Sequence, residues 1–92
     1  MYCIDNRYMT ASINTPEMQA LTKWLKQMRE EQHLTMRALA ERMDKPHSYV
    51  QKVEQGERRL DVVEYVWYCR ILGITPEEGL EQIRQAIPAS RN

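Results

Sequence analysis

With 92 residues, the chain is long enough for one compact core and too short for two. Its composition, 42% hydrophobic and 28% charged, is that of an ordinary globular domain, and no apolar run reaches the ~20 residues of a membrane span. The 13 basic and 13 acidic residues cancel, which argues against a strongly basic nucleic-acid-binding protein. Between residues 20 and 60, however, nine Lys or Arg outnumber six Asp or Glu, so positive charge is concentrated in the middle of the chain.

Residues 1–15 have no sustained hydrophobic period and are predicted to form a flexible N-terminal arm. This arm is more apolar than a typical tail and so more able to bind a surface, because it contains Tyr2, Ile4, Tyr8 and Met9. A frayed end is one interpretation, and an arm that lies on the domain, on a partner or along DNA is the other. The N-terminus lacks the basic start and apolar block of a secretion signal, so the cytoplasm is the expected compartment.

A first helix is predicted from about residue 16 to residue 32. It begins with Thr15, a good capping residue, and Pro16, which suits the first helical position. Apolar residues recur at three- and four-residue steps and should form its buried stripe: Met18, Leu21, Trp24, Leu25 and Met28.

Two shorter helices follow, separated by a polar break at Asp44, Lys45 and Pro46. The break has room only for a turn of three or four residues, so the two helices must cross steeply. Such a pair is a helix-turn-helix. Its predicted inward residues are Leu34, Met36, Leu39, Ala40 and Met43 on the first helix and Val50 and Val53 on the second.

The outward face of the second of these helices carries the functional signal. With Val50 and Val53 buried, the helical period turns polar side chains to solvent, and four of them are predicted to contact DNA bases: His47, Ser48, Gln51 and Lys52. Lysine or protonated histidine suits guanine acceptors in the major groove, and glutamine suits adenine. The alternative is an ordinary solvated helix face, which is polar in any protein.

A fourth helix is predicted from its cap at Asp61 to about Leu72, where Gly73 ends it. Its expected core face consists of Val62, Tyr65, Val66, Cys69 and Leu72. A fifth helix, to about residue 87, starts with a predicted capping box from Thr75 to Glu78 and with Pro76 at its first position. Residues 88–92 are expected to be a disordered tail.

The fourth helix has a second apolar stripe where a monomer would prefer polar groups. We expect this stripe and one face of the fifth helix to bury against a second copy of the chain about a twofold axis, with Trp67 as the anchor. A five-helix monomer is the alternative. The predicted interface residues are Val63, Trp67, Ile71, Ile74, Leu80 and Ile83.

The stretch from Leu21 to Ile74 resembles the Xre/Cro family of phage-type, lambda-repressor-like helix-turn-helix proteins. The segment VEQGERRLDVVEY is the most specific part of the resemblance. It implies an all-α, five-helix DNA-binding domain at residues 16–87, and a dimeric repressor of transcription that reads an inverted repeat in double-stranded DNA. The matching residues are Leu34, Thr35, Leu39, Ala40, Tyr49, Val50, Glu54, Gly56, Arg58, Arg59, Leu72 and Gly73.

The chain departs from the family pattern where His33 and Asp44 replace the usual glycines. Both positions are predicted to need positive φ, which His and Asp tolerate. The resemblance also implies that Arg29 pairs with Glu54. Phosphate contacts are predicted for Thr35, Arg37, Tyr49, Arg58 and Arg59, with Arg37 in place of the glutamine that Met36 replaces. Packing of its ring on the first helix of the helix-turn-helix is the alternative for Tyr49, and a solvated loop is the alternative for the two arginines.

Two other classes of function were compared with this hypothesis. The apolar residues of the N-terminal arm favour an antitoxin or another protein-interaction module, with a toxin as partner and DNA binding that is autoregulatory or lost. An enzyme has no support, because the sequence has no Gly-rich phosphate loop and no nucleophile beside a base. No cofactor or metal is expected, since neither the cysteines, Cys3 and Cys69, nor the two histidines have ligand spacing. Cys69 is predicted to be a buried thiol.

Overall fold

The computed structural model describes residues 15–87, which form five α-helices and no strand. The prediction of an all-α, five-helix domain is therefore confirmed. The predicted N-terminal arm and C-terminal tail lie outside the described residues, apart from Thr15. The helices are α2 (Pro16–Glu31), α3 (Met36–Arg42), α4 (Ser48–Glu54), α5 (Val62–Leu72) and α6 (Pro76–Ala86).

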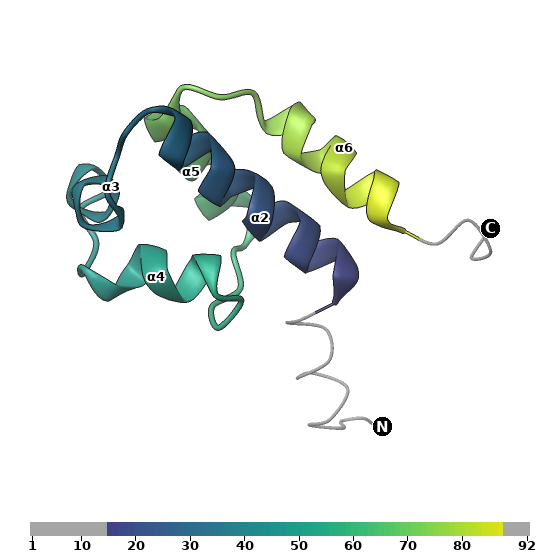
Figure 1. The fold of residues 1–92 in the computed structure, drawn as a ribbon, viewed down its shortest axis with the longest axis horizontal. Helices are drawn as coiled ribbons and strands as arrows, with labels where there is room; N and C mark the ends of the chain where they lie inside the picture. The colour runs from purple at the N-terminus through teal and green to yellow at the C-terminus, as the bar shows by residue number, and fades with distance from the viewer. Residues whose placement is uncertain (1–14, 88–92) are drawn as a thin grey trace.

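The helix α2 crosses the middle of the molecule, and the other helices are arranged around it (Figure 1). The helices α3 and α4 form the predicted helix-turn-helix at one end, and α4 also packs against α2. On the opposite side α6 runs along α2. The short helices of the helix-turn-helix are thus held by one long helix.

Side chains cap the first turns of three helices. Thr15 accepts a hydrogen bond from the Met18 N–H at 3.1 Å, and Thr35 accepts one from the Ala38 N–H at 3.0 Å. At α5, Asp61 accepts from the Glu64 N–H at 2.8 Å while Glu64 accepts from the Asp61 N–H at 3.4 Å, which completes a capping box. These caps satisfy N–H groups that have no partner within the helix.

The predicted capping box of α6 is wrong. Thr75 makes no side-chain cap, because the Glu78 N–H donates instead to the backbone carbonyl of Thr75 at 3.0 Å. Pro76 does occupy the first turn, as predicted.

The first four helices end in the same way, with one residue in the left-handed conformation. These residues are His33 (φ 59°), Asp44 (φ 58°), Gly56 (φ 78°) and Gly73 (φ 70°). In each case the next N–H donates back to the last helical turn, as Leu34 does to Arg29 at 3.3 Å and Lys45 does to Ala40 at 2.9 Å. The predicted positive φ of the two non-glycine residues is confirmed.

The core lies where α2, α3, α4 and α5 meet. Its fully buried side chains include Leu25, Leu39, Val50, Val53, Tyr68 and Cys69. Burial raises the pKa of the Cys69 thiol, as expected for a structural cysteine. Met36, predicted to point inward, is exposed, because it is the first residue of a short helix that buries Leu39 and Ala40.

The predicted core face of α5 needs correction at two residues. Val62 is 77% exposed and Val66 is also exposed, whereas Tyr68 is fully buried. The helix is therefore turned so that both of its inner tyrosines, Tyr65 and Tyr68, face the core together with Cys69 and Leu72. This orientation buries the larger side chains and leaves valines outside.

The contact between α6 and the rest of the domain depends on a glycine. Gly79 is buried, and a Cβ there would overlap the Tyr65 hydroxyl and lie 2.6 Å from a ring carbon of Trp24. The Tyr65 hydroxyl in turn donates to the carbonyl of Pro76 at the start of α6. This close approach fixes α6 against α2 and α5.

Candidate nucleic-acid interface

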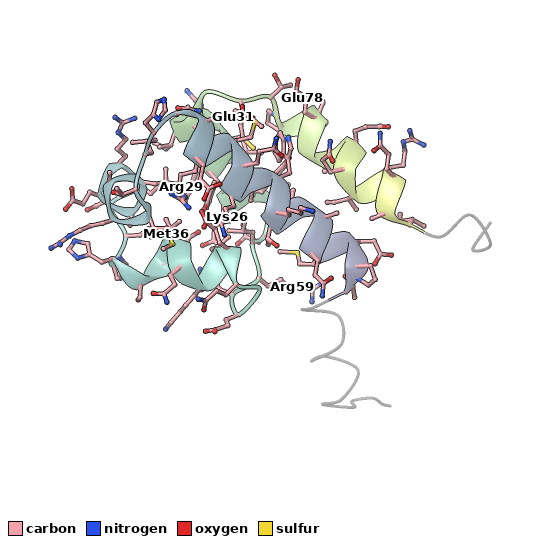
Figure 2. The ribbon with its side chains drawn as sticks, in the orientation of Figure 1. Lys26, Arg29, Glu31, Met36, Arg59 and Glu78 are labelled. Atoms are coloured by element: carbon pink, nitrogen blue, oxygen red, sulfur yellow. The ribbon has the colours of Figure 1, made fainter. Side chains whose placement is uncertain are left out.

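A buried ion pair connects α2 to the end of α4. Arg29 Nε lies 2.6 Å from Glu54 Oε2, and Nη2 lies 3.1 Å from Oε1, so the contact is bidentate. The third nitrogen, Nη1, donates to the carbonyl of Leu34 at 2.6 Å. The side chains are only 9% and 4% exposed, and the hydrogen bond to Glu54 raises the pKa of Arg29. Figure 2 shows Arg29 within the domain, between α2 and α4.

This pair sets the orientation of α4. Its last residue, Glu54, is fixed to α2, while Val50 and Val53 are fully buried on its inner face. A seven-residue helix has little stability of its own, so these contacts decide which side chains it presents to solvent.

The four residues predicted to contact bases lie together on that outer surface. His47 is the N-terminal cap residue of α4, and Ser48, Gln51 and Lys52 belong to the helix; all four are exposed. Their side chains supply donors and acceptors of the kinds that match base edges in the major groove.

Glu41, which the sequence analysis did not single out, lies beside two predicted DNA contacts. His47 Nε2 is 3.5 Å from Glu41 Oε2, and Arg37 Nε is 4.0 Å from the same oxygen. All three side chains are exposed, so these pairs contribute little stability. The four-residue spacing of Arg37 and Glu41 is a signal that would have found one pair; the other spans the turn.

Tyr49 was predicted to contact phosphate, and the structure corrects this prediction. Its side chain is buried, its ring centroid lies 6.5 Å from that of Tyr68, and its hydroxyl donates to Glu64 at 3.4 Å. Burial raises the pKa of Tyr49. The alternative of ring packing therefore holds, although the partner ring is on α5 and not on α3.

The loop after α4 carries the two arginines. Arg58 Nη2 lies 2.6 Å from Glu64 Oε2, and the guanidinium lies 5.0 Å from the centroid of the Tyr49 ring. The hydrogen bond to Glu64 raises the pKa of Arg58. Arg59 is exposed in the same loop (Figure 2) and lines a shallow hollow of about 220 Å³ with Leu60, Asp61 and Glu64. Thr35 is exposed, with its hydroxyl oxygen in the cap of α3.

A family model described as helix-turn-helix (HTH_3) matches residues 25–79, more than half of the chain. The chain belongs to the Xre family of lambda-repressor-like helix-turn-helix proteins. This is a family of DNA-binding regulators and not of enzymes, and the chain is a DNA-binding regulator of transcription.

Two solved structures are similar to this Xre-family chain. An XRE-family-like protein from Pseudomonas syringae pv. tomato str. DC3000 is 38% identical, with a TM-score of 0.70 over 78% of this chain and 88% of that one. The clp gene regulator ClgR from C. glutamicum is 22% identical, with a TM-score of 0.69 over 79% of this chain and 95% of that one, and supports the fold alone. A search of curated proteins found no significant match.

The residues predicted for the dimer interface of this Xre-family domain fall into two groups. Val63, Trp67 and Leu80 are exposed, and Trp67 is 53% exposed. Ile71, Ile74 and Ile83 pack instead against the core of their own domain and are partly buried. The helix α6 packs mainly along α2 and contacts α5 only slightly. Trp67 and Ile71 also line a hollow of about 380 Å³ beside the turn between α3 and α4.

Within residues 15–87, no group of His, Cys, Asp and Glu side chains is placed to hold a metal ion. None of the described helices combines the length and the apolar character that a bilayer crossing requires.

Proposed function

We propose that the chain is a dimeric, sequence-specific repressor that reads an inverted repeat by placing α4 in the major groove. The observation that carries this proposal is the exposed polar face of α4, held in one orientation by the Arg29–Glu54 pair. A recognition helix must present the same side chains each time it meets DNA, and a buried bidentate pair provides that.

The proposed contacts divide by position. His47, Ser48, Gln51 and Lys52 read base edges, while cations and hydroxyl groups around α4 hold the backbone. The proposed phosphate contacts from the sequence, now without Tyr49, are Thr35, Arg37, Arg58 and Arg59. The local excess of positive charge is modest, so non-specific affinity should be weak and should fall with salt.

The exposed stripe of α5 supports the dimer. Trp67 and Val63 are neighbours on the side of α5 that faces away from its own core, where a monomer loses stability by exposing apolar area. A second copy related by a twofold axis would cover both residues at once, because each protomer presents the same surface. The two recognition helices would then reach half-sites about one helical turn, ~34 Å, apart.

Selection of binding sites from a random DNA pool tests the reading of sequence. The wild-type chain should enrich an inverted repeat, and the double variant Gln51→Ala, Lys52→Ala should not, although it keeps the buried face of α4. Absence of enrichment at every salt concentration would contradict the proposal. It would favour the protein-interaction module, and capture of a partner such as a toxin would then be the next experiment.

Sedimentation equilibrium tests the dimer separately. Trp67→Ala should shift the chain from dimer to monomer, because aromatic anchors carry much of the energy of an interface. Met36→Ala is the matched control, since Met36 is an exposed apolar residue on α3 and lies outside the proposed interface. A wild-type chain that sediments as a monomer at every concentration would refute this part of the proposal.

A further inference from the structure

A third hollow, of about 280 Å³, lies where the turn between α3 and α4 meets the loop between α4 and α5. Its lining includes three cationic side chains and the Ser48 hydroxyl, and none of the described residues that line it carries a carboxylate. The lining residues are Lys45, Pro46, Ser48, Tyr49, Lys52 and Arg58.

Two of these cations are arranged around one buried ring. Lys45 Nζ lies 5.3 Å and Arg58 Cζ lies 5.0 Å from the centroid of the Tyr49 ring. The ring attracts both cations and cannot move, because it is packed against Tyr68 in the core. The Tyr49 ring is therefore a fixed surface against which both cationic side chains lie.

Each cation is also held by the backbone or by an acid behind it. Lys45 follows the left-handed residue Asp44, and its N–H donates to the carbonyl of Ala40, which fixes where its side chain begins. Arg58 uses Nη2 to bind Glu64, a residue that belongs to the capping box of α5. Glu64 does not line the hollow, so it can hold Arg58 without occupying the site.

We infer that this hollow binds one phosphate of the DNA backbone, with Lys45 and Arg58 as its two cationic contacts. The phosphodiester group has one negative charge and two free oxygens, which suits two cations and a hydroxyl donor at a single site. Ser48 and Lys52 belong both to the hollow and to the outer face of α4. A phosphate bound here would therefore set the register of α4 in the groove. The inference rests on the proposed entry of α4 into the major groove, and it adds Lys45 to the contacts expected from sequence.

The salt dependence of binding to a duplex of arbitrary sequence tests this inference, measured by fluorescence anisotropy. The variants are Lys45→Gln, Arg58→Gln and the double variant, which remove charge while keeping most of the side-chain length. Lys23→Gln is the matched control, because Lys23 is exposed on α2 and lies outside the hollow. Circular dichroism and a urea midpoint for every variant show that the fold is retained.

The expected result follows from counting phosphates. Each neutralised phosphate contributes about 0.9 to the slope of log affinity against log salt. If both cations hold one phosphate, the double variant should lower the slope by about 0.9 per protomer, and each single variant should lower it by less, because the remaining cation still neutralises that phosphate. A loss of about 1.8 would assign two phosphates and overturn the shared site. A change no larger than that of Lys23→Gln would overturn the site altogether.

The source of the phosphate is tested by chemical modification of DNA. In duplexes that carry the enriched inverted repeat, which fixes the register, single phosphates are replaced by neutral methylphosphonates; one position per half-site should weaken the wild type and leave the double variant unaffected. Amide shifts at Ser48 with inorganic phosphate, combined with an unchanged DNA slope, would instead assign the hollow to a free phosphate and overturn the assignment to DNA. The salt-slope measurement uses DNA of arbitrary sequence and does not depend on operator selection. A failure of sequence reading and a failure of the phosphate site therefore give different results.

Discussion

Removal of Glu54 is the strongest test of how the recognition helix is held. In Glu54→Ala the Arg29 guanidinium loses its bidentate partner and keeps the Leu34 carbonyl and the exposed Glu30 carboxylate, in a site where its own side chain is 9% exposed. Breaking a buried pair by removing one partner costs about 3–5 kcal/mol, because a charge is left without compensation. Two charged hydrogen bonds at roughly 1.5–3 kcal/mol each give about 3–6 kcal/mol, which overlaps that range.

Urea denaturation and thermal denaturation, each followed by circular dichroism, measure this loss of unfolding free energy. At about 4–8 °C per kcal/mol for a domain of this size, even 3 kcal/mol would lower the melting temperature by about 12–24 °C. Glu30→Ala is the matched control, since Glu30 lies 3.9 Å from Nη2 of the same arginine but is 57% exposed. The control should cost less than about 1 kcal/mol. If Glu54→Ala costs no more than Glu30→Ala, the pair does not fix α4 and the argument for a preset recognition helix fails.

Three further variants test separate parts of the fold. Gly79→Ala should cost about 1–3 kcal/mol in urea unfolding, because its Cβ would overlap the Tyr65 hydroxyl; an unchanged midpoint would contradict the tight packing of α6. Burial opposes ionisation of Glu64, but hydrogen bonds from Arg58 and the Asp61 N–H lower its pKa on balance. Ionised Glu64 therefore adds to the free energy of unfolding, and this contribution is lost as pH falls below the ordinary carboxyl pKa of 4.5. In Glu64→Gln, the free energy of unfolding should depend less on pH in that range. His33→Gly should stabilise the domain by no more than ~1 kcal/mol, since relief of left-handed strain is offset by chain entropy; a destabilised variant would count against strain at this position.

The helices and their ends could be predicted because their signals are local. Thr15 with Pro16 marks the start of α2, and His33 and Asp44 mark two turns that need positive φ. Each of these features depends on residues within one helical turn, so the sequence alone contains the information. The Arg29–Glu54 contact, 25 residues apart, was expected only through the resemblance to the family.

The orientation of α5 could not be predicted because this helix is apolar on nearly every side. Periodicity distinguishes an inner face only when the outer face is polar, and here Val62, Val66 and Trp67 are as apolar as the buried residues. Which face of α5 is buried depends on the volume of its side chains and on the helices packed against it, and these place Tyr68 inside. Its hydroxyl has no hydrogen-bond partner among the described residues, a cost that a sequence-based argument would count against burial.

The contacts around the proposed phosphate site were missed for a different reason. Arg58 meets Glu64 across a loop, and Lys45, in the turn between α3 and α4, has its Nζ 5.3 Å from the centroid of the Tyr49 ring. These pairs depend on how the helices cross, which spacing along the chain does not specify. Tyr49 lies at the proposed site, but its ring contacts Lys45 and Arg58 and its hydroxyl donates to Glu64.

The neutral net charge of the chain is compatible with DNA binding once the acids are placed. Glu54 is buried against Arg29, and Glu64 lies behind Arg58, so neither carboxylate is presented to an approaching backbone. Both acids instead fix a cation, which reduces the side-chain entropy that the cation must lose on binding. Exposed acids remain near the interface: Glu41 lies beside His47 and Arg37, and Asp44, Glu57 and Asp61 are exposed in the turn and the loop around α4. Affinity should therefore follow the few cations that are held in place and not the total charge. The same reasoning explains why removing Lys45 or Arg58 should matter more than removing an equally charged lysine on α2.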